Sequence, residues 1–340
     1  MHILTKRSGL AMALAIVIVV AAGIFVAGCG SSSSSSASST PTPSASGSTA
    51  AWTTADLAAI QSDSALKAAL PSNIQSAGTL KCASDIPYPP WEYYDPATST
   101  NPAGFDYDLS QALGKKIGIP VSFNKVPFGV IILSIKGGKN DMIMSDMYDS
   151  ADRQKSGVSF VDYASDGTSI LVPKGNPKGI SNIDSLVGKT VACESGTTQQ
   201  QFLQGLNKTF ASAGKTQMQI LALPDQPAAL LAVKAGRAVG DLTDHSTAEY
   251  IAKTQGNGAF FEVVNDPSAP NGYVPQLVGI GLVASNTALI DTMQKALQGL
   301  IDDGSYAKII AKWGVLPVQS AKVNDGPAFA AAQASASPAP

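Results

Sequence analysis

The chain has 340 residues, a formal net charge of −2 and only 14% charged residues. This balance argues against nucleic acid or an anionic membrane surface as an electrostatic partner. One of the two histidines is His2, so little remains for a histidine-based metal site or a Ser-His-Asp triad.

The first 28 residues form a predicted targeting signal. A positively charged start precedes an uncharged apolar run over residues 9–27, and Val26-Ala27-Gly28-Cys29 follows. This ending resembles a bacterial lipobox, which implies cleavage before Cys29 and lipidation of that residue. An uncleaved transmembrane anchor is the alternative, because the run is near the length that spans a bilayer. Both interpretations put the rest of the chain outside the cytoplasm, and several acyl chains would hold it on the outer face of the membrane.

Low-complexity sequence flanks the central part of the chain. Residues 29–50 are rich in Ser and Pro and are predicted to be a flexible tether. Residues 319–340 are rich in Ala, Ser and Pro, which predicts a disordered tail. The region between them is longer than one core usually serves, so we expect two lobes.

The pattern of the central region predicts an α/β fold. Apolar spacing indicates a helix over 52–70, within an N-terminal helical segment 51–78. Lobe 1 (79–170 and 275–318) and lobe 2 (171–274) each alternate strands with helices, which favours parallel sheets flanked by helices. The strand pattern over 273–283 returns the chain to lobe 1, so two strands cross between the lobes as a hinge.

Cys82 and Cys193 each lie in a predicted strand. A disulfide between them is an open alternative, but two buried free thiols are the preferred interpretation.

Polar residues gather in turns that follow predicted strands. These turns run over 85–88, 145–153 and 194–198, and they are expected to face one crevice. Singly, each residue has an ordinary structural explanation. Arg153 is compatible with a surface ion pair, Gly196-Thr197-Thr198 and Asp244 with helix caps, and Tyr88 and Phe128 with core packing.

Together, the ordered motifs resemble those of the bacterial extracellular solute-binding proteins of family 3. The resemblance covers nearly all of residues 80–313. The motifs are Asp85-Ile86-Pro87-Tyr88-Pro89-Pro90-Trp91-Glu92, Gly104-Phe105-Asp106-Tyr107-Asp108-Leu109, Gly138-Lys139-Asn140-Asp141, Arg153 with Phe160, Gly196-Thr197-Thr198, Ala235-Gly236-Arg237 with Asp244, Asp303-Gly304-Ser305-Tyr306 and Trp313-Gly314.

The resemblance implies a two-lobed periplasmic-binding-protein fold of type II and a site for an amino acid. In that site Arg153 would bind the ligand α-carboxylate, with Thr198 completing the clamp. Asp244 would hold the α-ammonium, and Tyr88 and Phe128 would enclose the aliphatic stem. The implied partners are a small-molecule ligand and the permease of an ABC importer, and the motif at 104–109 starts a helix without touching ligand.

Three residues depart from the family pattern. Asp146 and Tyr148, which follow Ser145, stand where relatives commonly carry Ser, Gly or Thr, and Glu194 stands where a neutral residue is frequent. Asp85, Asp146 and Glu194 together predict an acidic pocket, and burying these charges is costly without a cation. We therefore expect a cationic amino acid or another amine; the alternative is that Asp146 turns outward or pairs with a lysine.

Two other classes of function stay open. Some proteins of this fold resemble cyclohexadienyl dehydratases, and Glu194, Asp146 and Tyr148 are the candidate acids or bases for such an enzyme. A sensor ectodomain is the other class, although the sequence predicts no signalling domain after Trp313. The preferred expectation is a monomeric, lipid-anchored carrier without a catalytic role, a metal or a cofactor.

Overall fold

The computed structural model describes residues 52–336. Its strands are β1 (Leu80–Ser84), β2 (Tyr93–Tyr94), β3 (Pro102–Ala103), β4 (Val121–Lys125), β5 (Met142–Ile143), β6 (Val158–Pro173), β7 (Thr190–Glu194), β8 (Gln219–Leu223), β9 (Gly240–Asp244), β10 (Phe261–Val263), β11 (Tyr273–Val283) and β12 (Leu316–Val323). Its α-helices are α1 (Thr54–Ala59), α2 (Ser64–Ala69), α3 (Ser72–Ala77), α4 (Phe105–Ile117), α5 (Phe128–Lys136), α6 (Ala151–Lys155), α7 (Thr198–Ser212), α8 (Gln226–Lys234), α9 (His245–Thr254), α10 (Thr287–Asp302), α11 (Ser305–Trp313) and α12 (Gly326–Ala336).

The fold is two-lobed, and the predicted parallel sheets are confirmed. Within the described residues the main sheet has the order β4-β1-β5-β11-β6-β9-β7-β8, and β10 and β12 also pair with β6. In the first lobe β1 runs parallel to β4 and β5, and in the second β7 runs parallel to β8 and β9. The carboxyl ends of these strands are where an α/β fold places its ligands.

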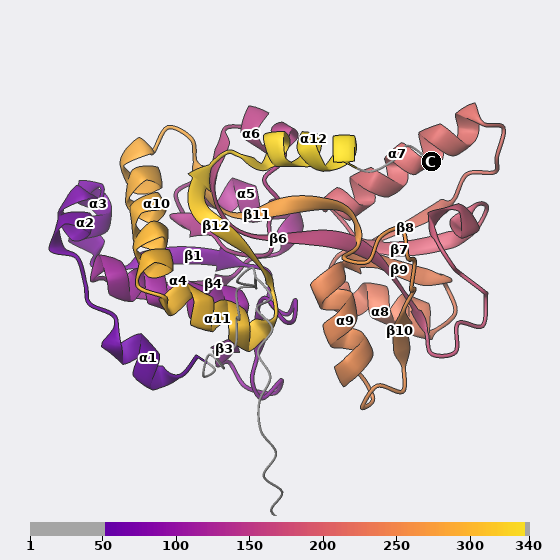
Figure 1. The fold of residues 1–340 in the computed structure, drawn as a ribbon, viewed down its shortest axis with the longest axis horizontal. Helices are drawn as coiled ribbons and strands as arrows, with labels where there is room; N and C mark the ends of the chain where they lie inside the picture. Colours follow the sequence, from indigo (N-terminus) through magenta and orange to yellow (C-terminus); the bar gives the residue numbers. More distant parts are fainter. Residues whose placement is uncertain (1–51, 337–340) are drawn as a thin grey trace, which may run out of the picture. The chain divides into compact units, whose positions relative to one another are not determined.

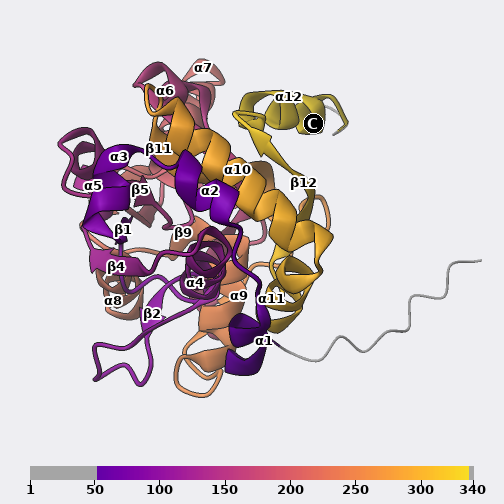
Figure 2. The ribbon, with the colours of Figure 1, turned by 90° about the vertical axis from the view of Figure 1, so that its left-hand side faces the viewer.

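Two long antiparallel strands join the lobes, as the expected two-strand hinge. β6 has 16 residues and pairs with β11 from Val158↔Val283 to Thr168↔Tyr273. Further along, β6 pairs with β9 of the second lobe. Figure 1 shows β6 and β11 running from the part of the sheet that holds β1 to the part that holds β7 and β9. Figure 2 shows α2 and α4 beside α10, which they contact.

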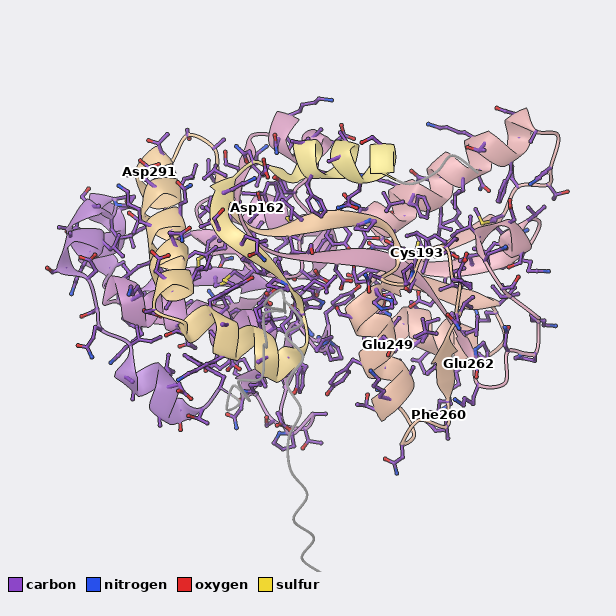
Figure 3. All side chains as sticks on the ribbon, viewed as in Figure 1. Asp162, Cys193, Glu249, Phe260, Glu262 and Asp291 are labelled. Carbon is purple, nitrogen blue, oxygen red and sulfur yellow. The ribbon has the colours of Figure 1, made fainter. Side chains whose placement is uncertain are left out.

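Apolar packing in the first lobe is centred on aromatic rings. Trp91 is completely buried and meets Phe105 edge to face, with ring centroids 5.4 Å apart, and Phe105 stacks on Tyr163 at 5.9 Å. Cys82 and Cys193 are buried and free, which confirms the interpretation as thiols. Figure 3 labels Cys193.

The N-terminal segment differs from the single helix predicted over 52–70. The structure has α1, α2 and α3, because the chain becomes extended at Ile60 and new helices start after Asp63 and Pro71. The Asp63 carboxylate accepts the Ala65 N–H at 2.8 Å, an N-cap that begins a helix rather than continuing one.

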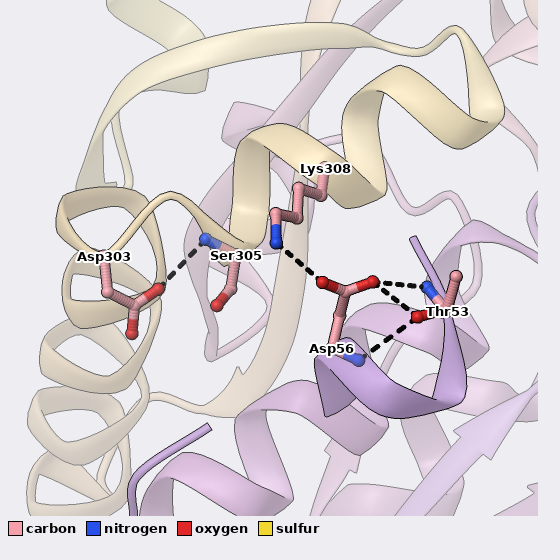
Figure 4. A network of polar contacts seen from close by, with 5 residues as sticks. All are labelled: Thr53, Asp56, Asp303, Ser305 and Lys308. Carbon is pink, nitrogen blue, oxygen red and sulfur yellow. Dashed lines mark hydrogen bonds and ion pairs between the residues drawn. The ribbon is translucent and has the colours of Figure 1, made fainter. Parts of the chain in front are cut away.

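A polar network fixes α1 against α11 (Figure 4). Thr53 and Asp56 form a capping box, in which the Asp56 N–H donates to Thr53 Oγ1 at 3.2 Å and Thr53 N–H donates to Asp56 Oδ2 at 2.9 Å. Lys308 Nζ lies 2.6 Å from Asp56 Oδ1, which ties this first helix to the end of the fold.

The prediction of a disordered tail over 319–340 is wrong for the residues that the structure describes. Residues up to Val323 complete β12, which pairs with β6, and α12 follows. The Gly326 N–H donates to Asp149 at 2.8 Å, and the Asp325 N–H donates to Asp162 (Figure 3) at 3.1 Å. These backbone hydrogen bonds order a segment whose composition is poor in large apolar residues. Residues 337–340 lie outside the described part.

None of the helices in residues 52–336 has the length and apolar character to cross a membrane. The predicted signal, Cys29 and the tether lie outside the described residues.

We predict that Gly104→Ala destabilises the first lobe. Gly104 has a φ of +124°, and an added Cβ would lie 2.2 Å from the Trp91 carbonyl oxygen. The free energy of unfolding, measured by urea titration, is expected to fall by at least about 2 kcal/mol. Gly205→Ala is the matched control, since Gly205 lies within α7 with nothing within 4 Å of the added Cβ, and it is expected to stabilise slightly. Equal stability of the two variants would contradict the prediction.

Candidate functional site

A small cavity lies at the carboxyl ends of the parallel strands. It collects nine of the ten side chains predicted from the sequence and two that were not. The lining residues are Asp85, Tyr88, Phe128, Ser145, Asp146, Arg153, Glu194, Thr197, Thr198, Gln199 and Asp244.

The acids of the cavity owe their places to the strands that precede them. Asp85 follows β1, and Asp146 lies in the turn after β5. Glu194 is the last residue of β7, and Asp244 the last of β9. Because the strands of the two lobes run towards each other along β6, their carboxyl ends meet, and residues far apart in the sequence converge on one space.

Arg153 is the single guanidinium in the lining. Ser150 caps its short helix α6 by accepting the Arg153 N–H at 3.4 Å. The side chain is 9% exposed, its Nη1 donates to the Tyr148 carbonyl at 2.8 Å, and its Cζ lies 5.4 Å from the Phe128 ring centroid. Burial lowers the pKa of Arg153 to about 10, while the negative charges of Asp244 and Asp146 act in the opposite direction. The group is therefore a cation held in a largely dry site.

Tyr148 is the predicted site residue that the structure does not bring to the cavity lining. Its ring is 1% exposed within the core of the first lobe, and its hydroxyl donates to the Gly167 carbonyl at 3.2 Å. The backbone of Tyr148 forms a bridge with Val278 of β11, which directs the ring into the core. Tyr148 contributes to the site through its carbonyl, which holds Arg153, and through its hydroxyl, which lies close enough to Asp244 to offset part of the rise that burial causes in the pKa of that acid.

Asp244 has both carboxylate oxygens engaged in hydrogen bonds. The Tyr88 hydroxyl donates to Oδ2, and Gln199 Nε2 donates to Oδ1 at 2.6 Å. The Tyr88 hydroxyl also lies 2.8 Å from Thr243 Oγ1. Burial raises the pKa of Asp244 above its usual range, and these hydrogen bonds partly offset that effect. Since Tyr88 follows β1 and Asp244 ends β9, these bonds join the two lobes across the cavity.

Asp146 is the least compensated acid of the site. It is 6% exposed, and neither of its carboxylate oxygens has a hydrogen-bond partner among the described residues. Burial raises its pKa well above the usual range, and the charges of Asp244 and Asp166 add to this. A buried carboxylate without a donor is costly, so this group is ready to accept a cation or a donor from a ligand.

A second pair of acids, Glu194 and Asp85, shares the cavity. Glu194 is 3% exposed and its Oε1 has no hydrogen-bond partner in the described structure. Burial first, and then the neighbouring Asp85, raise the pKa of Glu194 to about 10. Burial also raises the pKa of Asp85. The lining thus sets four carboxyl groups against one guanidinium.

Thr197 and Gln199 line the cavity although sequence reasoning did not select them. Thr197 caps α7 by accepting the Gln200 N–H at 3.2 Å, and its own hydroxyl donates to the Glu194 carbonyl at 2.8 Å. The Gly196-Thr197-Thr198 motif contained the signal for Thr197, because the first turn of a helix presents consecutive residues to the same ligand. Gln199 carried no comparable signal.

Three comparisons with known proteins agree on one family. The model of the bacterial extracellular solute-binding proteins, family 3, matches residues 80–315. The chain is 27% identical over 250 residues to the ABC transporter arginine-binding protein 1 of Escherichia coli strain K12, covering 73% of this chain and 96% of that protein. It is 28% identical over 237 residues to the lysine/arginine/ornithine-binding periplasmic protein of the same strain, covering 69% and 87%.

Solved structures give the same picture. An ancestral arginine-binding protein bound to arginine superposes with a TM-score of 0.59 at 29% identity, covering 69% of this chain and 98% of that one. The ancestral amino acid-binding protein AncCDT-1, described as a precursor of cyclohexadienyl dehydratase, gives a TM-score of 0.59 at 28% identity, covering 71% and 97%.

We predict that Glu194→Gln stabilises the ligand-free protein as the pH rises. The folded protein keeps a proton on Glu194 up to about pH 10, whereas the unfolded chain loses it near the ordinary value of 4.5. The contribution of Glu194 to stability is therefore lost progressively between these values. The substitution is expected to raise the free energy of unfolding by at least about 1 kcal/mol at pH 8 and to change it little at pH 4.

The control is Glu249→Gln, on α9 (Figure 3), where the carboxylate pairs with Lys253 at 2.8 Å on the surface. Its effect is expected to stay within about 0.5 kcal/mol at both pH values. A Glu194→Gln effect that is the same at pH 4 and pH 8 would show that Glu194 is not protonated in the folded protein.

Proposed function

Because the chain belongs to the bacterial extracellular solute-binding proteins of family 3, we propose that it captures a cationic amino acid and delivers it to an ABC importer. The observation that carries the cationic part is the balance of four carboxyl groups against Arg153 in the cavity, with both Asp146 oxygens lacking a partner in the described structure. Arginine, lysine and ornithine are the candidates, and the names of the relatives support this class.

In the proposed binding mode, different residues of the cavity contact different parts of the ligand. Arg153 pairs with the α-carboxylate of the ligand, and Thr198 adds the N-terminus of α7 from the other lobe. Asp244 holds the α-ammonium, and Tyr88 and Phe128 enclose the aliphatic stem. Asp85, Asp146 and Glu194 then receive the side-chain cation, whose charge favours the ionised form of these acids.

This mode would couple binding to closure of the lobes. Lobe 1 (79–170 and 275–318) supplies Arg153 and Asp146, and lobe 2 (171–274) supplies Asp244 and Glu194, so a ligand contacts both only when they close. Differential contacts of that kind are what shift such an equilibrium. The proposal includes lipidation at Cys29, which would keep the monomeric carrier on the outer face of the membrane near its permease.

A carrier of a non-amino-acid amine and an enzyme of the dehydratase type are the rival proposals. The first would use the acids without Arg153. The second would use Glu194 as an acid or base, since its raised pKa leaves it a proton to donate. Its support is the likeness to AncCDT-1, which is itself described as an amino acid-binding protein.

We expect a calorimetric panel to rank the cationic amino acids first. The purified protein is titrated with L-arginine, L-lysine, L-ornithine, L-citrulline, L-glutamine and L-glutamate. L-Arginine is expected to bind at least about tenfold more tightly than L-citrulline, which has the same length and a neutral end. Tight binding of glutamate without binding of arginine would refute the cationic ligand. Turnover of prephenate or arogenate would instead establish an enzyme.

Arg153→Ala is predicted to abolish recognition of the α-carboxylate. Affinities for L-arginine and L-citrulline are both expected to fall by at least about 30-fold, because a buried charge on the ligand would lose its partner. Agmatine, which is arginine without its carboxylate, is expected to lose no affinity. Arg237→Ala is the control, since Arg237 is exposed. Thermal unfolding checks that both variants fold, and an unchanged arginine affinity would place the clamp elsewhere.

A further inference from the structure

Two acids lie completely buried behind the cavity without lining it. Glu92 and Asp106 are both 0% exposed. Glu92 closes the proline-rich turn that follows β1, and Asp106 is the second residue of α4. Burial raises the pKa of Asp106 to about 7, and burial followed by the charge of Asp106 raises the pKa of Glu92. Burying two adjacent acids costs folding free energy.

Glu92 is linked by hydrogen bonds through Ser145 to one cavity acid, Asp85. The Ser145 hydroxyl donates to Glu92 Oε1 at 2.5 Å. The same hydroxyl oxygen accepts the backbone N–H of Asp85 at 2.9 Å. Glu92 also exchanges backbone hydrogen bonds with Tyr88, at 2.6 and 3.0 Å, which closes the turn between them. Glu92 therefore sets where Asp85 and Tyr88 enter the cavity.

Asp106 contacts the backbone of a second cavity acid, Asp146, directly. Its Oδ2 accepts the backbone N–H of Asp146 at 2.9 Å. Asp146 has a φ of +43°, a left-handed conformation that is strained for a residue with a side chain. Without a buried acceptor at this point, the turn would be free to relax to an ordinary conformation and rotate the Asp146 carboxylate out of the cavity.

The helix start that carries Asp106 is itself fixed on the Glu92 turn. The Asp106 N–H donates to the Trp91 carbonyl at 2.9 Å, and Gly104 approaches the same carbonyl too closely for any Cβ. One rigid unit thus presents both acceptors to the turn after β5.

We propose that Asp106, supported by Glu92, is a positioning residue for cation recognition: it holds Asp146 in the strained conformation that directs its carboxylate at the ligand. This inference rests on the proposed function and extends it to residues outside the cavity. The motif at 104–109 then has a binding role although it touches no ligand.

The test compares Asp106→Ala and Asp106→Asn by calorimetry with L-arginine and L-citrulline. Asp106→Ala removes the acceptor and is expected to weaken arginine binding about tenfold while changing citrulline binding less than about threefold. Asn retains a side-chain oxygen for the Asp146 N–H, so Asp106→Asn is expected to keep the arginine preference within about threefold of the wild type. In an Asp146→Asn background, Asp106→Ala is expected to cause no further loss of preference.

Asp108→Ala separates positioning from stability. Asp108 lies in the same first turn of α4, where its carboxylate contacts Lys312 at 2.7 Å and Trp313 Nε1 at 2.8 Å. Its loss is expected to lower the melting temperature without changing the ratio of arginine to citrulline affinity. An Asp106→Ala variant with an unchanged ratio, or one matched by Asp108→Ala, overturns the proposal.

A second measurement does not depend on the ligand. Hydrogen exchange of the Asp146 amide, followed by NMR, is expected to accelerate more than about tenfold in Asp106→Ala and to stay slow in Asp106→Asn. Unchanged protection in Asp106→Ala overturns the positioning role even if arginine binds. If the wild type shows no preference for arginine over citrulline, the proposed function fails, and the exchange measurement still decides whether Asp106 holds Asp146.

Discussion

The structure depends on burying carboxyl groups that have too few positive partners. Asp85, Asp146, Glu194 and Asp244 meet where parallel strands of two lobes end, and Arg153 is the guanidinium that faces them. The fold tolerates this arrangement in part because Asp244 is satisfied by Tyr88 and Gln199. The remaining deficit is electrostatic, and under the proposed function a cationic ligand removes it when the lobes exclude water. The local loss of stability would then be recovered as affinity for the ligand.

The two-strand hinge determines how the lobes on either side of the acid-lined cavity can move. β6 and β11 pass between the lobes, so the two lobes share continuous hydrogen-bonded strands and can rotate without losing their own cores. The hydrogen bonds from Tyr88 to Thr243 and Asp244 join the lobes at the cavity, using protein groups in the place that a ligand also needs. In the proposed binding mode, a ligand that pairs with Asp244 has to replace some of these contacts.

Much of this arrangement follows from local sequence rules. Asp85 and Glu194 were predictable because each lies at the carboxyl end of an apolar strand, whereas the role of Arg153 came from the resemblance to the family. Tyr148 was expected at the site from the same resemblance, but its backbone bridge with Val278 directs the ring into the core of the first lobe. Glu92 and Asp106 look like surface acids in the sequence, and only tertiary packing reveals that they are buried. The C-terminal segment lacked large apolar residues, so its order depends on a partner strand that composition does not disclose.

The pairing of β12 with β6 has a consequence for the order in which the chain can be completed. The second lobe is one continuous segment, whereas the first requires β11, α10, α11 and β12 from the end of the chain. The carboxylates of Asp149 and Asp162 receive their N–H donors from residues 325 and 326. When the chain emerges amino end first, the second lobe can therefore fold before the last strand of the first lobe, β12, is available. The acid-lined cavity therefore forms only when nearly the whole polypeptide is available for folding.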